Sequence, residues 1–371
     1  MNDSVLLLTP GPTPVPDEVS RALAEPLLHH RTPEFQALLG EVRLGLRELF
    51  QTEQEVLLLG TSGTGVMEAA VVNLFSPGDR VVVIDAGKFG SRWTELCEAF
   101  GVKAHVLRLE RGKALELQEL ETCLNNEGRG AKAVLFQASE TSTGLKLPVQ
   151  EITETAHRAG ALSVCDSITA LGAFDLPMDL WGVDVLMSSS QKALLLPPGL
   201  SFIALSERAW KAHSEARLPR YALDLGRQLK AQKKNLTAWT PPTQIIQGLR
   251  ASLKLLLKDG LPTRLQKTSE LARFSRSEAE RLNLKLVSPQ APSEALTAVW
   301  IPSGLILDGS IPKQLREQHG IVIAGGQDEL EGRILRISHF GGVTKDHLIR
   351  GYQALEAVLR KAGHSIEPSN F

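Results

Sequence analysis

Residues 56–65 read Val-Leu-Leu-Leu-Gly-Thr-Ser-Gly-Thr-Gly. The apolar run 56–59 has the length and composition of a buried strand, and it ends at Gly60. A helical pattern then runs over 65–75 and is closed by Pro77 and Gly78. This stretch therefore predicts a buried strand, a glycine-rich turn and a helix in succession.

The same alternation extends along the chain. Apolar residues recur at helical spacing from Phe35 to Leu49, ahead of the first strand. Further strands are expected at 81–84, 102–107, 133–136, 162–165, 185–187 and 202–205, and further helices at 91–99 and 150–159. Helices that alternate with short buried strands are typical of a mainly parallel α/β sheet covered on both faces.

The pattern changes after residue 261. Pro241 and Pro242 precede an amphipathic helix expected over 245–257, which leads out of the first unit. Beyond it we expect helices at 265–282, 311–319 and 346–361 and strands at 284–287, 296–301 and 333–338. We interpret 1–261 as a large domain, with an N-terminal arm over about 1–20, and 262–371 as a smaller C-terminal domain.

Composition narrows the class of protein. The chain has 371 residues, and 41 Lys and Arg against 42 Asp and Glu leave it without the basic excess that favours nucleic acid. No apolar run approaches the roughly 20 residues that cross a bilayer, and the N-terminus does not resemble a secretory signal. Cys97, Cys123 and Cys165 form no Cys-x-x-Cys pair, which argues against a disulfide framework and a zinc site and favours the cytoplasm.

Three short segments carry chemistry. Residues 61–65, Thr-Ser-Gly-Thr-Gly, could hold a phosphate at a helix N-terminus, although a plain glycine-rich turn is the alternative. Asp166 ends a predicted strand, where it could keep a heterocyclic nitrogen protonated or merely cap a turn. Lys192 lies between small residues and an apolar run, which would lower its pKa and favour a Schiff base, whereas most lysines are simply solvated. Together they match the needs of pyridoxal 5'-phosphate.

At this point the sequence resembles the class V, fold-type I aminotransferases of the alanine-glyoxylate and serine-pyruvate kind, from Leu6 to Leu359. The matching stretches are Leu8–Pro12, His30–Phe35, Ser62–Thr64, Lys88–Arg92, Glu140–Gly144, Asp166–Ser167, Ser190–Lys192 and Leu335–Ser338. The resemblance implies an α/β fold, with a mainly parallel seven-stranded sheet in the large domain and a smaller α+β domain after it.

The resemblance also implies roles for individual residues. Lys192 would form the Schiff base with the cofactor, and Asp166 would pair with the pyridinium nitrogen. The other cofactor-binding residues implied are Ser62, Gly63, Thr64, Phe89, Thr141, Ile168, Gln191, Thr237 and Thr240. Thr240 matches a residue that reaches the phosphate of the neighbouring subunit, which implies a homodimer with shared active sites. Thr237 departs from the Tyr often found in that motif.

Substrate binding is expected at Arg336, whose guanidinium matches a carboxylate, and at the loop that contains Gly11. Arg31 and Arg92, which also lie in motifs, are interpreted as structural ion-pair formers. Since no second Arg is assigned to a side-chain carboxylate, small donors such as Ala or Ser are favoured, with glyoxylate or pyruvate as acceptor. The expected reaction is a ping-pong transamination through the Schiff base at Lys192.

Alternatives on the same fold remain open. An aspartate or 2-aminoethylphosphonate transaminase would use the same Arg336. A cysteine desulfurase or another class V lyase is less favoured, because desulfurases need a nucleophilic Cys after the Lys and stack a His at the position of Phe89. A non-catalytic subunit that accompanies a hydrogenase is disfavoured by the intact Lys192 and Asp166.

Overall fold

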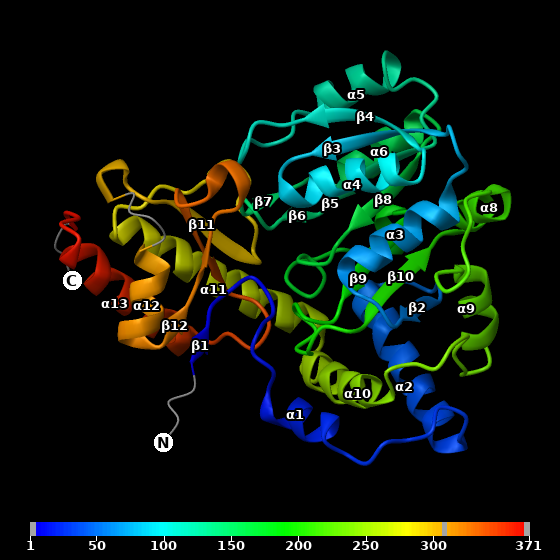
Figure 1. The fold of residues 1–371 in the computed structure, drawn as a ribbon, viewed down its shortest axis with the longest axis horizontal. Helices are drawn as coiled ribbons and strands as arrows, with labels where there is room; N and C mark the ends of the chain where they lie inside the picture. The colour runs from blue at the N-terminus through cyan, green and yellow to red at the C-terminus, as the bar shows by residue number, and fades with distance from the viewer. Residues whose placement is uncertain (1–4, 306–309, 367–371) are drawn as a thin grey trace.

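The structure is a computed structural model that describes residues 5–305 and 310–366. Its centre is a seven-stranded sheet with the order β2-β10-β9-β8-β5-β3-β4 (Figure 1). The strands are β2 (Val56–Leu59), β3 (Arg80–Asp85), β4 (Lys103–Arg108), β5 (Ala133–Gln137), β8 (Leu162–Asp166), β9 (Val185–Ser189) and β10 (Ser201–Leu205). β10 is antiparallel to both neighbours, whereas the other pairs are parallel.

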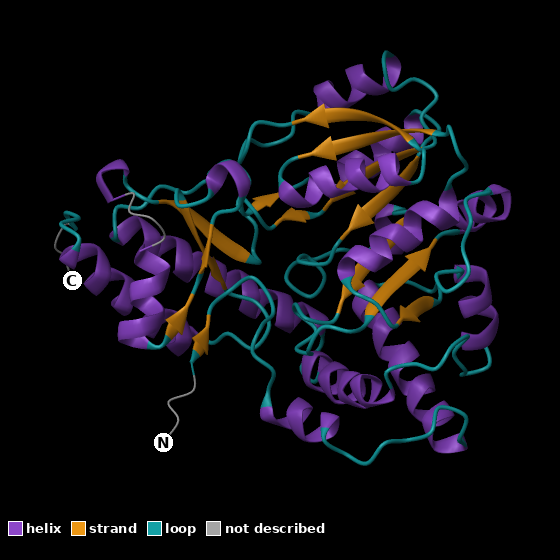
Figure 2. Cartoon of the chain, viewed as in Figure 1, coloured by secondary structure: helices purple, strands orange, loops and turns teal. Residues whose placement is uncertain are grey.

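Helices cover both faces of this sheet (Figure 2). They are α2 (Pro33–Phe50), α3 (Gly63–Leu74), α4 (Lys88–Ala99), α5 (Leu117–Asn125), α6 (Val149–Arg158), α7 (Met178–Trp181), α8 (Glu207–Glu215) and α9 (Leu225–Gln232). Successive side chains of β3 join different apolar clusters, Val82 and Ile84 on one face and Val81 and Val83 on the other. Burial on both faces explains why the strands are almost continuously apolar.

A second unit follows α10 (Thr243–Leu257), which packs against α2 and α1 (Asp17–Leu23). Its antiparallel sheet has the order β11-β14-β13. Its elements are α11 (Leu261–Arg281), β11 (Leu296–Trp300), α12 (Ser310–His319), β12 (Ile321–Val322), β13 (Ala324–Gly325), β14 (Ile334–Ser338) and α13 (Lys345–Lys361). We propose residues 1–261 and 262–371 as the two domains. β1 (Leu6–Leu7) crosses between them and pairs with β12.

The predicted strand at 284–287 is wrong. This segment forms only an isolated bridge, Leu286 to Val299, beside β11. Pro289 and Pro292 follow closely, and because proline lacks a backbone donor they prevent the ladder from extending. The short polar helix α8 is not among the predicted helices, since a single apolar stripe is hard to recognise over so few residues. The basic segment 217–234, for which a solvated loop or helix face is expected, contains the helix α9.

A hairpin of two short strands, β6 (Ser139–Glu140) and β7 (Leu145–Lys146), projects from the end of β5. It carries Thr141 in its turn and brings this residue to the edge of the sheet where the parallel strands end. In the described part of the chain, no helix is both long enough and apolar enough to cross a membrane.

Candidate active site

A cavity of about 160 Å³ lies at the carboxyl ends of the parallel strands. Open α/β sheets bind ligands at this edge. The side chains that line it come from five separate segments of the large unit: Ser62, Gly63, Thr64, Phe89, Arg92, Ser139, Thr141, Asp166, Ile168, Thr169, Gln191 and Lys192. Most of the residues that the sequence assigned to cofactor binding are therefore gathered around one space.

Asp166 is the last residue of β8 and is only 5% exposed. One of its carboxylate oxygens accepts a hydrogen bond from the Ile168 backbone N–H at 2.8 Å. Burial raises the pKa of this carboxyl from 3.8 to about 6, although the Ile168 N–H opposes that shift. A cationic partner stabilises the ionised form of a buried carboxylate, and a protonated ring nitrogen would provide such a partner.

Lys192 follows β9 in a tight turn and is 9% exposed. Burial lowers the pKa of its amine from 10.5 to about 8, whereas the charge of Asp166 acts in the opposite direction. The amine donates a hydrogen bond to the backbone carbonyl of Pro10. An amine with a lowered pKa is more often neutral near pH 7 and is thus better suited to nucleophilic attack on an aldehyde.

The N-terminal loop closes over Lys192. The Thr13 hydroxyl donates to the Lys192 carbonyl at 2.8 Å, and the Thr13 backbone N–H donates to the Gln191 carbonyl. Gly11 has φ +133°, and a Cβ placed there would lie 2.6 Å from Lys192 Nζ. Only glycine allows the loop to approach the lysine this closely.

The N-terminus of α3 faces the cavity with small residues. The Ser62 hydroxyl accepts a hydrogen bond from the Gly65 N–H and caps the helix. A Cβ at Gly63 would lie 2.7 Å from Ile168 Cδ1, so the backbone here must be bare. A helix N-terminus with exposed N–H groups attracts an anion such as a phosphate. The neighbouring Gln191 is hydrogen-bonded to Ser189 at 2.5 Å.

Glu140 lies in the matching stretch Glu140–Gly144, where the local sequence indicates no role for it. Its fully buried carboxylate accepts hydrogen bonds from the backbone N–H groups of Phe89 and Gly90, which begin α4. It also accepts from Ser142 and Gln137. Burial raises the pKa of Glu140 and these donors oppose the shift. Glu140 thereby fixes the position from which Phe89 enters the cavity.

The structural ion pairs expected for Arg31 and Arg92 are not found among the described residues of the single chain, where neither side chain pairs with a carboxylate. Arg92 lies instead with its guanidinium carbon 5.0 Å from the centre of the Phe89 ring, one helical turn along α4, and lines the cavity. A cation over an aromatic face is attracted by the ring quadrupole, so Arg92 stabilises the position of the Phe89 ring.

Arg336 on β14 reaches the same region from the C-terminal unit, and it is 6% exposed. Its guanidinium donates to the carbonyls of Gly325 at 2.8 Å and Thr141 at 3.1 Å and to Gln327 Oε1 at 3.3 Å. Burial lowers its pKa. Thr141, in turn, shares a 2.7 Å hydroxyl–hydroxyl hydrogen bond with Thr169.

Thr237 and Thr240 do not line this cavity. They lie in a separate hollow with Trp239 and Pro242, and Thr237 donates to the Trp239 carbonyl. His339, close behind Arg336 in the sequence, does not line the cavity either. It is buried between Thr297 and the Glu294 carbonyl, and burial lowers its pKa to about 3.

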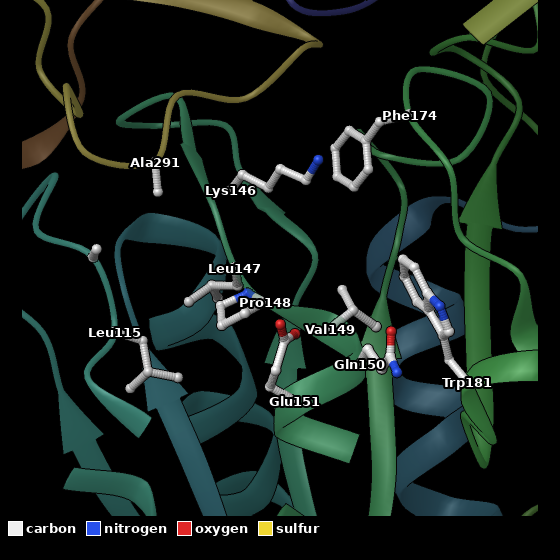
Figure 3. Close-up of a pocket in the computed structure, with 11 residues that line it drawn as sticks. Leu115, Lys146, Leu147, Pro148, Val149, Gln150, Glu151, Phe174, Trp181 and Ala291 are labelled. Atoms are coloured by element: carbon white, nitrogen blue, oxygen red, sulfur yellow. The ribbon is translucent and has the colours of Figure 1, made fainter. Parts of the chain in front are cut away.

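A larger hollow of about 450 Å³ lies beside α6 (Figure 3). Its walls are mostly apolar, with Leu147, Val149 and Trp181 among them. Its lysine, Lys146, is paired with Glu294 at 2.9 Å, and its amine lies 4.3 Å from the centre of the Phe174 ring. The groups that can perform chemistry lie around Lys192 instead.

The fold and the cavity define a pyridoxal-phosphate enzyme of fold type I. A helix N-terminus for the phosphate, a buried carboxylate, an aromatic ring and an amine of lowered pKa fit the parts of that cofactor. Residues 5–335 match the family model for aminotransferase class-V. The chain belongs to this family of aminotransferases, and its cofactor is pyridoxal 5'-phosphate.

Individual relatives cover nearly the whole chain. A protein from Anabaena cylindrica named soluble hydrogenase 42 kDa subunit is 40% identical over 98% of this chain and 95% of its own. The aspartate aminotransferase of subgroup IV from Thermus thermophilus is 34% identical with a TM-score of 0.89, over 96% and 99% of the two chains. Alanine–glyoxylate aminotransferase from Nostoc sp. is 31% identical with a TM-score of 0.92, over 97% and 96%.

The lowered pKa of Lys192 generates a first prediction. In the cofactor-free protein, acetylation of Lys192 by acetic anhydride should rise with pH around a midpoint of about 8, because only the neutral amine reacts. Asp166→Asn should move this midpoint lower, since the carboxylate no longer stabilises the ammonium form. Peptide mapping by mass spectrometry measures both. A midpoint near 10.5 would contradict the buried site.

The contact at Gly11 generates a second prediction. Gly11→Ala should displace the Lys192 amine and weaken cofactor binding about ten-fold or more, since overpacking typically costs about 1–3 kcal/mol. Gly101→Ala is the matched control, because Gly101 also has a positive φ, +69°, but open space around its Cβ. Absorbance titration with the cofactor should separate the two variants, and equal affinities would refute the contact.

Proposed function

We propose that the protein transfers the amino group of a small amino acid, alanine or serine, to glyoxylate or pyruvate in a ping-pong reaction. Lys192 is the residue that forms the Schiff base. The observation that carries this proposal is the buried pair of Lys192 and Asp166 around one cavity, with Arg336 reaching the same place from the other unit.

Each part of the cofactor has residues suited to it. Ser62, Gly63, Thr64 and Gln191 would hold the phosphate, and Phe89 and Ile168 would lie on the two faces of the ring. Asp166 would keep the ring nitrogen protonated, and Thr141 would face the phenolic oxygen. When bound, pyridoxal phosphate supplies an electron sink for the pair of electrons left on the amino acid's Cα.

Proton movement falls to Lys192. Its free amine would act as the general base that accepts the proton from the substrate Cα, and the resulting ammonium group would act as the general acid that gives this proton back. Its burial excludes water from this step. Asp166 stays ionised beside the protonated ring nitrogen, because the two opposite charges stabilise each other in the low-dielectric cavity.

Arg336 would bind the α-carboxylate of the substrate. Its guanidinium fork matches a carboxylate, and the three acceptors around it hold it still. Transamination of aspartate is a second candidate function. Arg92 favours it, because this residue brings another guanidinium to the cavity, as the side-chain carboxylate of aspartate would require. The similarity to the Thermus aspartate aminotransferase points the same way. A 2-aminoethylphosphonate donor would instead place its phosphonate at Arg336.

A homodimer with shared active sites would explain the position of Thr237 and Thr240. Both line a hollow of their own chain that does not include Lys192, and this hollow would serve a partner's phosphate site. A cytoplasmic location suits the three cysteines, all of which are free thiols.

Two rival functions lack support. A desulfurase would need an accessible thiolate, but Cys97, Cys123 and Cys165 are buried, and burial raises the pKa of each. A non-catalytic subunit that accompanies a hydrogenase, the enzyme named for the Anabaena relative, would have no use for a buried lysine of lowered pKa.

A kinetic comparison of amino donors tests this proposal. Alanine and serine should turn over fastest among alanine, serine, aspartate and 2-aminoethylphosphonate, each with glyoxylate or pyruvate as acceptor. Arg336→Gln should lower kcat/KM about 100-fold, since hydrogen bonds to charged groups contribute about 1.5–3 kcal/mol each. Steady-state kinetics with detection of the product oxo acid measures both.

The control variant is Arg158→Gln, which removes an exposed guanidinium on α6 and should leave kcat/KM unchanged. Fastest turnover with aspartate would replace the proposal with its aspartate alternative. Failure of every donor, with cofactor bound, would contradict transamination of these substrates.

A further inference from the structure

The segment 324–330 lies beside Arg336 and contacts its guanidinium. β13 pairs with β14, and the Gly325 carbonyl accepts from Arg336 Nε at 2.8 Å. Two residues further on, Gln327 Oε1 accepts from the same guanidinium at 3.3 Å. This segment therefore supplies two of the three hydrogen-bond acceptors that the structure places around Arg336.

The residues that follow Gln327 are tied to the large unit by charge. Asp328 pairs with Lys88 at 3.1 Å. Glu329 pairs with Arg111, which also pairs at 2.8 Å with Asp85, a side chain that is only 2% exposed at the end of β3. We call Lys88, Arg111, Asp328 and Glu329 the clasp. It anchors a turn of the C-terminal unit to the central sheet.

The turn has little room to adjust. A Cβ at Gly326 would lie 1.8 Å from the Leu330 carbonyl oxygen, so the chain folds back tightly on itself. Asp328 has φ +50°, in the left-handed region that non-glycine residues seldom adopt and that Asp and Asn tolerate best. The ion pair with Lys88 favours this conformation, and the conformation in turn fixes where Gln327 lies.

The clasp also joins two walls of the site. Lys88 is the first residue of α4 and immediately precedes Phe89, whose ring lines the cavity. Asp328 immediately follows Gln327. A change in the clasp therefore moves the surroundings of Arg336 relative to the cavity, although none of its four side chains lines the cavity.

We propose that the clasp residues are positioning residues that hold Gly325 and Gln327 against Arg336 and thereby set the affinity of the site for the substrate carboxylate. The inference rests on the proposed function, because it takes Arg336 as the group that binds this carboxylate. The clasp acts by preorganisation: an arginine already held in place loses less freedom when the substrate arrives.

Salt sensitivity follows from the exposure of the pair. Asp328 and Lys88 side chains are 49% and 38% exposed, so added salt screens their attraction. Added salt should therefore raise the KM of the native enzyme, in part by weakening the clasp. That part disappears when the clasp is already broken.

Asp328→Asn is the direct test, because Asn tolerates the same backbone conformation and removes only the charge. It should raise KM for the amino donor about two- to five-fold, the range expected for an exposed ion pair, with kcat unchanged. Adding Glu329→Gln should bring the increase to about ten-fold. The inhibition constant of propanoate, a carboxylate with no amine, should rise in parallel, and KM should depend less on salt.

Asp259→Asn is the matched control. Asp259 is 57% exposed and pairs with Lys267 at 2.9 Å, remote in sequence from the clasp, so its loss should leave KM and its salt dependence unchanged. An unchanged KM in Asp328→Asn, or a fall in kcat at constant KM, would overturn the clasp. If Arg336→Gln raises KM and the clasp variants do not, only the proposed role of the clasp is refuted. If Arg336→Gln also leaves KM unchanged, the role of Arg336 fails as well.

Discussion

The site depends on the burial of an amine and a carboxylate around one small cavity. Burial disfavours the charged form of each, which raises the pKa of Asp166 to about 6 and lowers that of Lys192 to about 8. Their mutual attraction works against both shifts. A cationic ring nitrogen would pair with the buried charge of Asp166. An aldehyde is a suitable reaction partner for the neutral amine of Lys192.

The sheet makes this arrangement possible. Asp166 ends β8 and Lys192 follows β9, and the carboxyl ends of these adjacent parallel strands meet at the same edge of the sheet. Glycine at positions 11 and 63 allows the backbone to approach the side chains of Lys192 and Ile168 closely. The C-terminal unit adds Arg336, whose hydrogen bond to the Thr141 carbonyl joins the two units at the cavity.

Sequence reasoning located what local patterns encode. The strand ends before Asp166 and Lys192 and the glycine-rich turn 61–65 are visible in short windows, because strand burial and helix capping act over a few residues. Glu140 and Arg92 were missed or misread, since their roles depend on Phe89, about 50 residues from Glu140, and on a cavity assembled from separate segments. The roles of Thr237 and Thr240 stay predictions, because they need a second chain.

The measurement that tests the account most directly is reduction of the holoenzyme with sodium borohydride, followed by peptide mapping. The account predicts a stable phosphopyridoxyl group on the peptide that contains Lys192 and nowhere else in the chain. A label on another lysine, or no label on an enzyme that contains the cofactor, would contradict it.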